Sequence, residues 1–191
     1  MDKLKGFLRQ IIPISDEEFE KALPYFEKLN LKRGDYFVQQ GKVCRQIAFI
    51  NKGTLRTFYL NHKSDDVTSC FCNENCFATS YKSFIQRSPS ELAIQAMVDS
   101  ELFVISYENL NKLYDTNPIW LTIGRVLAER EYLIVEKYAS MLNNETAKEK
   151  YLRLMKEQPS IVQIASVEDI ASYLGVTRRT LSRIRKEITN N

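Results

Sequence analysis

The chain has 191 residues, a formal net charge of +3 and 44% hydrophobic residues. This length suits one large domain, or a medium domain with a small one, and the apolar content is enough for a hydrophobic core. The small net charge excludes a polycation that coats nucleic acid in bulk. Any contact with nucleic acid therefore has to come from a local cluster of basic residues. No apolar run reaches the length of a membrane span, and Met1 to Gln10 lacks the apolar core of a signal peptide. We therefore expect a cytoplasmic protein with no membrane partner.

The N-terminal part of the sequence predicts one short helix followed by closely spaced strands. Ser15 and Glu18 have the spacing of a capping box, which predicts a helix over 16–23. After Gly34, β-favouring stretches alternate with turns. The stretches are Tyr36 to Val38, Gln46 to Asn51, Thr54 to Leu60, Asp66 to Phe71, Leu92 to Val98 and Leu102 to Ser106. Such spacing favours a small antiparallel roll or barrel.

The sequence contains four cysteines but no secretion signal, so we expect no disulfides. Cys70, Cys72 and Cys76 do not have the spacing of a CxxC pair, and Cys70 and Cys72 on one strand would simply share a face. Together with Cys44 they are interpreted as structural thiols, with no metal and no cofactor. His62 is the only histidine and has no evident partner, and no phosphate-binding glycine loop is present. We expect no enzymatic activity.

From Pro118 the hydrophobic pattern changes to a helical period that lasts more than six turns. The apolar positions assigned to a dimer interface are Ile119, Ile123, Val126, Leu127, Leu133, Ile134 and Tyr138. Such a helix is longer than one small domain can cover, which favours a stripe left for a partner; the alternative is a helix that lies wholly on its own roll.

A break at Asn143 and Asn144 predicts a hinge, and a further helix is expected over 146–157, ended by Pro159. The residues expected to face inward from this helix are Tyr151, Leu152, Leu154 and Met155.

Residues 167–186 predict two short helices joined by a tight turn. Ile170 and Leu174 lie one turn apart on the first helix, which Ser166 can cap together with Asp169. Leu181 and Ile184 form the matching stripe on the second helix. Between them, Gly175 can take the positive φ that ends a helix and Thr177 can cap the next one. The two stripes can be buried only against each other or against a third helix, which is the pattern of a helix-turn-helix.

The second of these helices leaves a set of hydrogen-bond donors exposed. They are Thr177, Arg178, Arg179, Thr180, Ser182, Arg183, Arg185 and Lys186. These side chains suit phosphates and guanine edges in a major groove, so the motif indicates DNA binding. The alternative is an ordinary helical hairpin with a solvated basic face.

Several motifs in this order resemble the Crp/Fnr superfamily of bacterial transcription regulators. They are the Lys32 to Asp35 turn, Gly41, the stretch from Ile47 to Gly53 and the terminal helix-turn-helix. The resemblance covers nearly the whole chain and implies an α+β protein. It implies an N-terminal cyclic-nucleotide-binding-type antiparallel β-roll over 1–117, a dimerisation helix over 118–143 and a helix-turn-helix domain over 144–191. It further implies a homodimer on a near-palindromic DNA operator, with RNA polymerase as a further candidate partner.

The sequence departs from the resemblance at the cyclic-nucleotide site. Family members that bind cyclic AMP have a Gly-Glu pair and, after a short helix, Arg-Ser or Arg-Thr. Here Ala78-Thr79 and Ser90-Glu91 stand at these places, and Arg87 could substitute only after a register shift. Serine cannot imitate the phosphate clamp of an arginine, so we expect no response to cyclic nucleotides.

The same region is rich in aromatic residues, which could line a pocket for a different and more apolar effector of unknown identity; the alternative is plain core. The residues assigned to this effector pocket are Phe71, Phe77, Ala78, Thr79, Tyr81, Ser90 and Glu91.

The recognition helix also differs from the pattern that the resemblance implies. Arg178 and Arg183 match the family's arginines, but Arg179 stands where the family tends to have a glutamate, so we expect a different operator. The sequence ends at Asn191, before the two-stranded wing with which the family usually continues, so a smaller phosphate footprint is expected. The rival interpretation is a ligand or redox sensor that acts through protein contacts without useful DNA binding.

Overall fold

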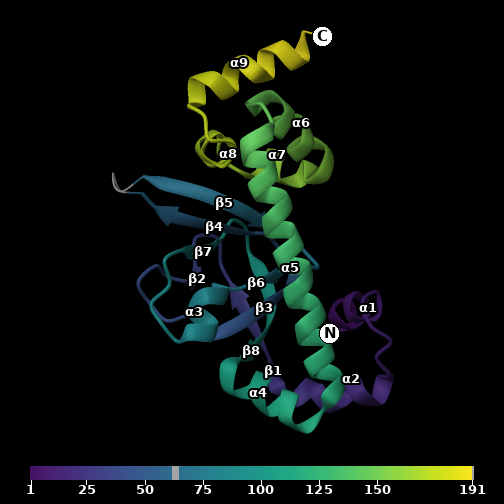
Figure 1. The fold of residues 1–191 in the computed structure, drawn as a ribbon. Helices are drawn as coiled ribbons and strands as arrows, with labels where there is room; N and C mark the ends of the chain where they lie inside the picture. The colour runs from purple at the N-terminus through teal and green to yellow at the C-terminus, as the bar shows by residue number, and fades with distance from the viewer. Residues whose placement is uncertain (62–64, 191) are drawn as a thin grey trace.

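The computed structural model describes residues 1–61 and 65–190, without the side chains of residues 138 and 141–143. It shows an α+β protein in which a β-roll is followed by a long helix, α5, and by a group of shorter helices at the far end of α5 (Figure 1). None of the described helices is long and apolar enough to cross a membrane. The expected combination of an antiparallel roll and C-terminal helices is confirmed.

The roll consists of two four-stranded sheets in which all strand pairs are antiparallel. The first sheet has the order β1 (Phe26–Leu31), β8 (Ser100–Ser106), β3 (Gln46–Lys52) and β6 (Phe77–Ala78). The second has the order β2 (Tyr36–Val38), β7 (Ala93–Ala96), β4 (Leu55–Leu60) and β5 (Asp66–Cys72). The sequence predicted six of these strands. It missed β1, whose apolar residues do not alternate strictly, and β6, which has only two residues.

Two apolar clusters hold the roll together. Inside it, Ile50, Leu55, Ile94 and Leu102 are fully buried between the two sheets. The second cluster lies where the N-terminal helices pack on the roll beside the start of α5. These helices are α1 (Asp2–Arg9), α2 (Asp16–Ala22) and the 3₁₀ turn η1 (Leu23–Tyr25). The predicted capping box at α2 is present, whereas the sequence analysis missed α1.

Helices α3 (Tyr81–Gln86) and α4 (Tyr107–Thr116) lead to α5 (Pro118–Asn144), which begins at Pro118 as predicted. The first turns of α5 pack on the chain's own roll, with Trp120 and Ile123 buried. Ile119, Val126 and Leu127 are partly buried in the same cluster. The prediction of a partner surface therefore needs correction at Ile123, which the roll and the N-terminal helices bury, and it stays a prediction at the three partly buried residues.

The second half of α5 is different, because all described side chains from 131 to 137 are exposed. Leu133 is 60% exposed and Ile134 is 57% exposed. The side chain of Tyr138 lies outside the described part of the structure. Of the remaining predicted dimer residues, Leu133 and Ile134 are thus the most exposed.

Four helices follow α5 and share one core: α6 (Ala147–Glu157), α7 (Pro159–Ile164), α8 (Val167–Leu174) and α9 (Arg178–Thr189). Thr146 caps α6, as the predicted start of this helix requires. Tyr151 and Leu154 are each 4% exposed, but Leu152 is 43% exposed and Met155 is 38% exposed. The prediction that all four face inward was wrong for the last two, because the narrow core accepts only one stripe of α6. Pro159 not only follows α6 but also opens α7.

The two leucines of α6 provide a matched test of this core. Leu154→Ala should lower the free energy of unfolding by about 2–5 kcal/mol because it leaves a cavity between α6 and its neighbours. Leu152→Ala makes the same chemical change at an exposed site and should cost no more than about 0.5 kcal/mol. Urea unfolding followed by circular dichroism measures both. Equal losses in the two variants would contradict the assignment of the core.

Candidate nucleic-acid interface

Helices α8 and α9 are joined by a turn whose chemistry the sequence encodes. Gly175 ends α8 with φ of 69°, in the left-handed region that glycine adopts without strain. Thr177 caps α9, since its hydroxyl accepts a hydrogen bond of 3.2 Å from the Thr180 N–H. Ile170, Leu174, Leu181 and Ile184 are at most 5% exposed and pack in one cluster. The predicted apolar stripes therefore meet, and they orient the opposite face of α9 outward.

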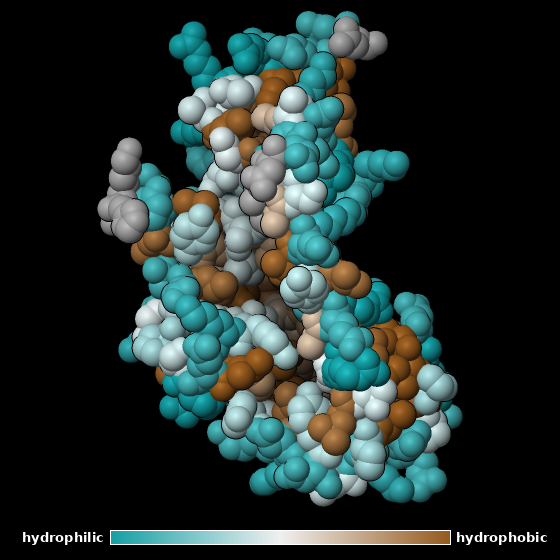
Figure 2. All heavy atoms as spheres, in the orientation of Figure 1, coloured by the Kyte–Doolittle hydropathy of each residue, from teal (hydrophilic) through white to brown (hydrophobic). Residues whose placement is uncertain are grey.

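The outward face of α9 is strongly basic. The helix contains five basic residues and one acidic residue. Arg178, Arg179, Arg183 and Lys186 are exposed, as are Thr177 and Ser182, whereas Thr180 is half-buried. In Figure 1, α9 forms the end of the molecule opposite α2 and α4, and Figure 2 shows mainly hydrophilic residues there. Positive charge is thus concentrated at one exposed end of a nearly neutral protein.

The basic side chains of α9 differ in whether they form ion pairs within the protein. Arg178 forms an ion pair with Glu168 of α8, and Arg183 lies 3.9 Å from the Glu187 carboxylate. Within the described part of the chain, Arg179 and Lys186 form no ion pair and are free to meet a ligand.

Arg185, predicted to anchor phosphate, is half-buried in its own helical unit. Its Nε donates a 3.0 Å hydrogen bond to the Tyr151 hydroxyl, and its guanidinium lies 5.5 Å from the centre of that ring. These contacts give Arg185 a structural role, which leaves its part in phosphate binding a prediction.

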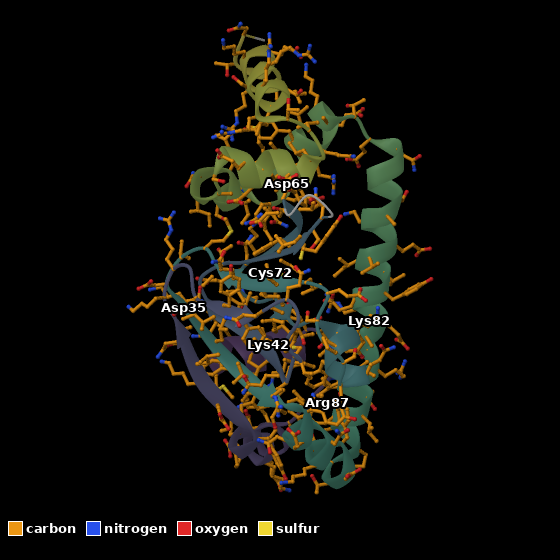
Figure 3. All side chains as sticks on the ribbon, turned by 90° about the vertical axis from the view of Figure 1, so that its left-hand side faces the viewer. Asp35, Lys42, Asp65, Cys72, Lys82 and Arg87 are labelled. Carbon is orange, nitrogen blue, oxygen red and sulfur yellow. The ribbon has the colours of Figure 1, made fainter. Side chains whose placement is uncertain are left out.

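Helix α8 is docked on the outer strand of the roll, β5. The Thr68 N–H donates a 2.9 Å hydrogen bond to the Ser172 hydroxyl, which in turn donates a 2.8 Å bond to the Asp66 carbonyl. Beside them, the rings of Phe71 and Tyr173 lie 5.3 Å apart. Figure 3 shows Asp65, at the outer end of the β4–β5 hairpin, beside the C-terminal helices. The β-roll and the basic helix α9 are thus linked through α8.

A buried arginine completes this contact. Arg56 of β4 is 8% exposed, and its Nη1 lies 3.1 Å from Asp66 and 3.0 Å from Asp169 of α8. Its Nε donates a 2.9 Å hydrogen bond to the Thr68 hydroxyl. Asp169 also forms the capping box of α8 with Ser166, so one carboxylate both caps the helix and binds it to the roll. The sequence analysis missed Arg56, and the available signal was a single charged residue in a mainly apolar strand.

The aromatic residues of the predicted effector pocket lie in separate cores. Phe71 packs with α6 to α9, whereas Phe77 lies 5.3 Å from Phe49 and 5.7 Å from Phe7 at the N-terminal helices. Ala78 belongs to the core of the roll, and Tyr81 is 50% exposed. The structure does not bring these four residues to one cavity, in line with the plain-core alternative.

The polar side chains at the predicted nucleotide site all have partners within the protein. The hydroxyls of Ser80 and Ser90 are 2.8 Å apart, and the Ser90 hydroxyl is 2.7 Å from the Leu92 carbonyl. The Thr79 hydroxyl donates a 3.1 Å hydrogen bond to the Gln46 carbonyl. Glu91 forms an ion pair with Lys82. The site therefore offers short hydroxyls and a carboxylate, which do not form a clamp for a cyclic phosphate.

Arg87, the candidate substitute for the missing arginine, is held elsewhere. It ends α3 with φ of 54° and donates a 3.2 Å hydrogen bond to the Cys44 carbonyl. Its guanidinium also lies 4.6 Å from the centre of the Tyr107 ring and 3.7 Å from the Glu108 carboxylate. With these contacts, Arg87 is engaged with α4 and the start of β3.

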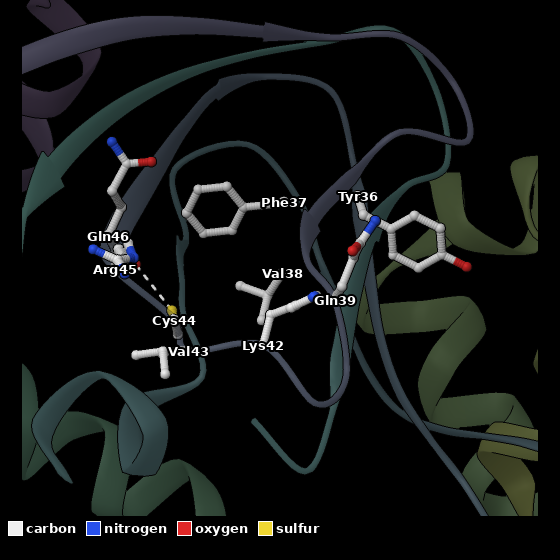
Figure 4. A pocket seen from close by; sticks show the side chains of 9 residues that line it. All are labelled: Tyr36, Phe37, Val38, Gln39, Lys42, Val43, Cys44, Arg45 and Gln46. Atoms are coloured by element: carbon white, nitrogen blue, oxygen red, sulfur yellow. Dashed lines mark hydrogen bonds between the residues drawn. The ribbon is translucent and has the colours of Figure 1, made fainter. Parts of the chain in front are cut away.

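A cavity of about 300 Å³ lies at β2 and the segment that leads to β3 (Figure 4). Its lining consists of Tyr36, Phe37, Val38, Gln39, Lys42, Val43, Cys44, Arg45 and Gln46. None of the seven residues predicted for the effector pocket is among them. Within the described residues there is no group of three metal-ligating side chains, all four cysteines are free thiols, and His62 lies outside those residues.

Comparison with known proteins agrees with this architecture. Residues 28–117 match the family model "Cyclic nucleotide-binding domain". No curated protein matches the chain. Among solved structures, FixK2 from Bradyrhizobium japonicum has a TM-score of 0.73 at 16% identity, with 86% of this chain and 85% of that chain covered.

Two further structures are similar over most of their length. The regulator CLP from Xanthomonas campestris, described as responsive to c-di-GMP, has a TM-score of 0.72 at 17% identity, and 92% of each chain is covered. A putative Crp/Fnr-family transcriptional regulator from Eubacterium rectale has a TM-score of 0.71 at 18% identity, covering 94% of this chain and 88% of that one. These matches are to transcription regulators rather than to enzymes. Residues 28–117 are therefore similar to the cyclic nucleotide-binding domain, and the whole chain shares its fold with these solved structures.

Proposed function

We propose that the protein is a homodimeric, sequence-specific DNA-binding transcription regulator that does not respond to cyclic AMP. The observation that carries the proposal is the exposed basic face of α9, which is fixed by the Thr177 cap and by the buried Leu181 and Ile184. The fold shared with transcription regulators supports it. We infer a sensor domain over 1–117, a dimerisation helix over 118–143 and a helix-turn-helix domain over 144–191.

In this proposal, α9 enters the major groove with its N-terminal end toward the bases. Arg178, Arg179 and Arg183 contact base edges. Thr177, Thr180, Ser182, Arg185 and Lys186 contact mainly phosphates. Because Arg178 is ion-paired with Glu168, DNA has to replace that carboxylate, whereas Arg179 is free from the start. Arg179 is therefore the strongest candidate for direct base readout.

Dimerisation is supported by the exposed half of α5. Tyr132, Leu133, Ile134 and Val135 are 57–68% exposed, and these consecutive positions occupy every side of the helix. A hollow of about 440 Å³ lies between this region and the preceding turn, lined by Ala128, Glu129, Tyr132 and Leu133. Pairing of α5 with its copy would bury part of this apolar surface and place two α9 helices in successive major grooves, roughly 34 Å apart.

The first test selects bound duplexes from a random pool at moderate salt, using the purified protein, and sequences them. We expect an enriched near-palindrome. Arg179→Ala should lower affinity for it by about 1–3 kcal/mol and relax the preference at one position per half-site. Lys186→Ala, the matched control on the same helix, should weaken binding to all duplexes alike and reduce its salt dependence. Retention without enrichment would contradict the proposal and favour a sensor that acts through protein contacts.

The dimer is tested by placing charge on the exposed half of α5. Leu133→Glu combined with Ile134→Glu should convert the protein to a monomer in sedimentation experiments, because two copies would bring four carboxylates into one apolar contact. Leu121→Glu is the control: Leu121 is also exposed, at 54%, but points about 120° away from Leu133 around the helix. A monomeric parent protein, or dissociation by the control alone, would contradict the assigned interface.

The absence of a cyclic-nucleotide response is tested by calorimetry with cyclic AMP and cyclic GMP. We expect no binding heat, because Ser80 and Ser90 bond to each other where a phosphate clamp would be needed. Thermal unfolding of the same sample shows that the protein is folded. Micromolar binding of either nucleotide would contradict this part of the proposal.

A further inference from the structure

Two cysteines of β5 form a close pair. Their side chains share one face of the strand, and the Sγ atoms of Cys70 and Cys72 are 3.7 Å apart. Cys70 lies opposite Thr57 of β4 and Cys72 opposite Leu55. The pairing skips Ser69, so the strand bulges directly before Cys70. Both residues are partly buried in the structure.

This geometry is close to that of a disulfide. A disulfide has an S–S length of about 2.05 Å and spans Cα separations of about 4.4–6.8 Å. Two residues in one strand advance by about 6.8 Å, at the upper end of that range. Closure therefore requires side-chain rotation and a slight contraction of the strand. The bulge at Ser69 provides backbone freedom for this change.

The two thiols differ in their readiness to react. The hydrogen bond with Cys72 lowers the pKa of the Cys70 thiol. The same contact, together with burial, raises the pKa of Cys72 well above its usual range. Burial also raises the pKa of Cys76, and the nearby Glu131 carboxyl of α5 adds to this effect. In the exchange reaction proposed below we assign the attack to Cys70 and the resolving step to Cys72, whose Sγ atoms are 3.7 Å apart.

The residues between and beside these cysteines hold α8. Phe71 is the buried partner of Tyr173, and the Thr68 N–H is bonded to the Ser172 hydroxyl. A contraction between Cys70 and Cys72 therefore moves Phe71 and the docking strand.

We propose that Cys70 and Cys72 are a thiol-disulfide exchange site for low-molecular-weight disulfides, and that its closure loosens the contact between β5 and α8. In the first step the Cys70 thiolate attacks one sulfur of the reagent, whose S–S bond breaks. A mixed disulfide forms and one thiolate leaves and takes up a proton. Cys72 then loses its proton to solvent and attacks the Cys70 sulfur, which expels the second thiol. The two protein thiols are oxidised by two electrons, and the reagent is reduced to two thiols.

The disulfide formed in this way should reopen readily. A bond that contracts its strand stores strain, and strained disulfides are the easily reduced ones. The site is therefore a reversible one rather than a structural crosslink. This inference does not depend on DNA binding and can be tested without it.

The test treats the reduced full-length protein with oxidised glutathione, blocks free thiols and maps the peptides by mass spectrometry. The expected product is a Cys70–Cys72 disulfide that reduced glutathione reopens. Cys72→Ser should instead accumulate a glutathione adduct on Cys70, and Cys70→Ser should lose closure. Cys44→Ser and Cys76→Ser are the matched controls and should close as the parent protein does. Circular dichroism checks that each variant is folded.

Hydrogen exchange of the closed and reduced forms tests the link to α8. We expect faster exchange in β5 and α8 after closure, and no change in the double variant Cys70→Ser with Cys72→Ser treated with the same reagent, because it can form neither the disulfide nor an adduct at this site. Adducts on both cysteines without closure, or a dominant link to Cys76, would overturn the exchange site. Unchanged exchange in the closed protein would overturn its coupling to α8.

Discussion

The contact on which the arrangement of this molecule depends is the buried guanidinium of Arg56 between the roll and α8. A buried charge is stable only when its partners are close and well oriented, and here Asp66 supplies one carboxylate from the roll and Asp169 the other from α8. Because Asp169 also caps α8, the position of that helix and its local stability are tied to the same group. Because the turn at Gly175 is short, the orientation of α8 also determines the orientation of α9. The direction of the basic face is thus set from within the roll.

Helix α5 combines two environments in one element. Its first turns complete the chain's own core through Trp120 and Ile123, while residues 131–137 extend beyond the cover of the roll. The apolar side chains within residues 131–137 are exposed to water, which is unfavourable. Burial against a further surface would be favourable for them. In the proposed dimer a second copy would supply such a surface with matching chemistry and would give the two basic helices a fixed separation. The first turns of α5 therefore contribute to the folding of the roll, whereas residues 131–137 contribute to the proposed pairing with a second copy.

The domain over 28–117 has the fold of a cyclic nucleotide-binding domain but differs in the polar residues at the expected nucleotide site. Residues 28–117 retain the two antiparallel sheets, yet hydroxyls of Ser80 and Ser90 occupy the polar site and Arg87 is engaged by Tyr107 and Glu108. Packing requires only that side chains fill the core, whereas phosphate binding requires a free cation at one point. In the proposed function the domain does not respond to cyclic nucleotides, and the paired thiols of β5 are the proposed alternative chemistry, on the strand that contacts α8.

The sequence by itself determined the elements whose signals are local: the capping boxes at Ser15 and Ser166, the glycine turn before α9, most strands of the roll and the start of α5. These depend on neighbours a few residues apart, so spacing and residue type suffice to predict them. Only the tertiary structure decided which apolar residues of α5 the roll covers, that Leu152 and Met155 face outward, and that Phe71 and Phe77 belong to separate cores. It also decided the pairing of Arg56 with Asp169, more than a hundred residues apart. Long-range contacts of this kind follow from how whole elements pack, because amphipathic pattern fixes a buried face but not the surface that buries it.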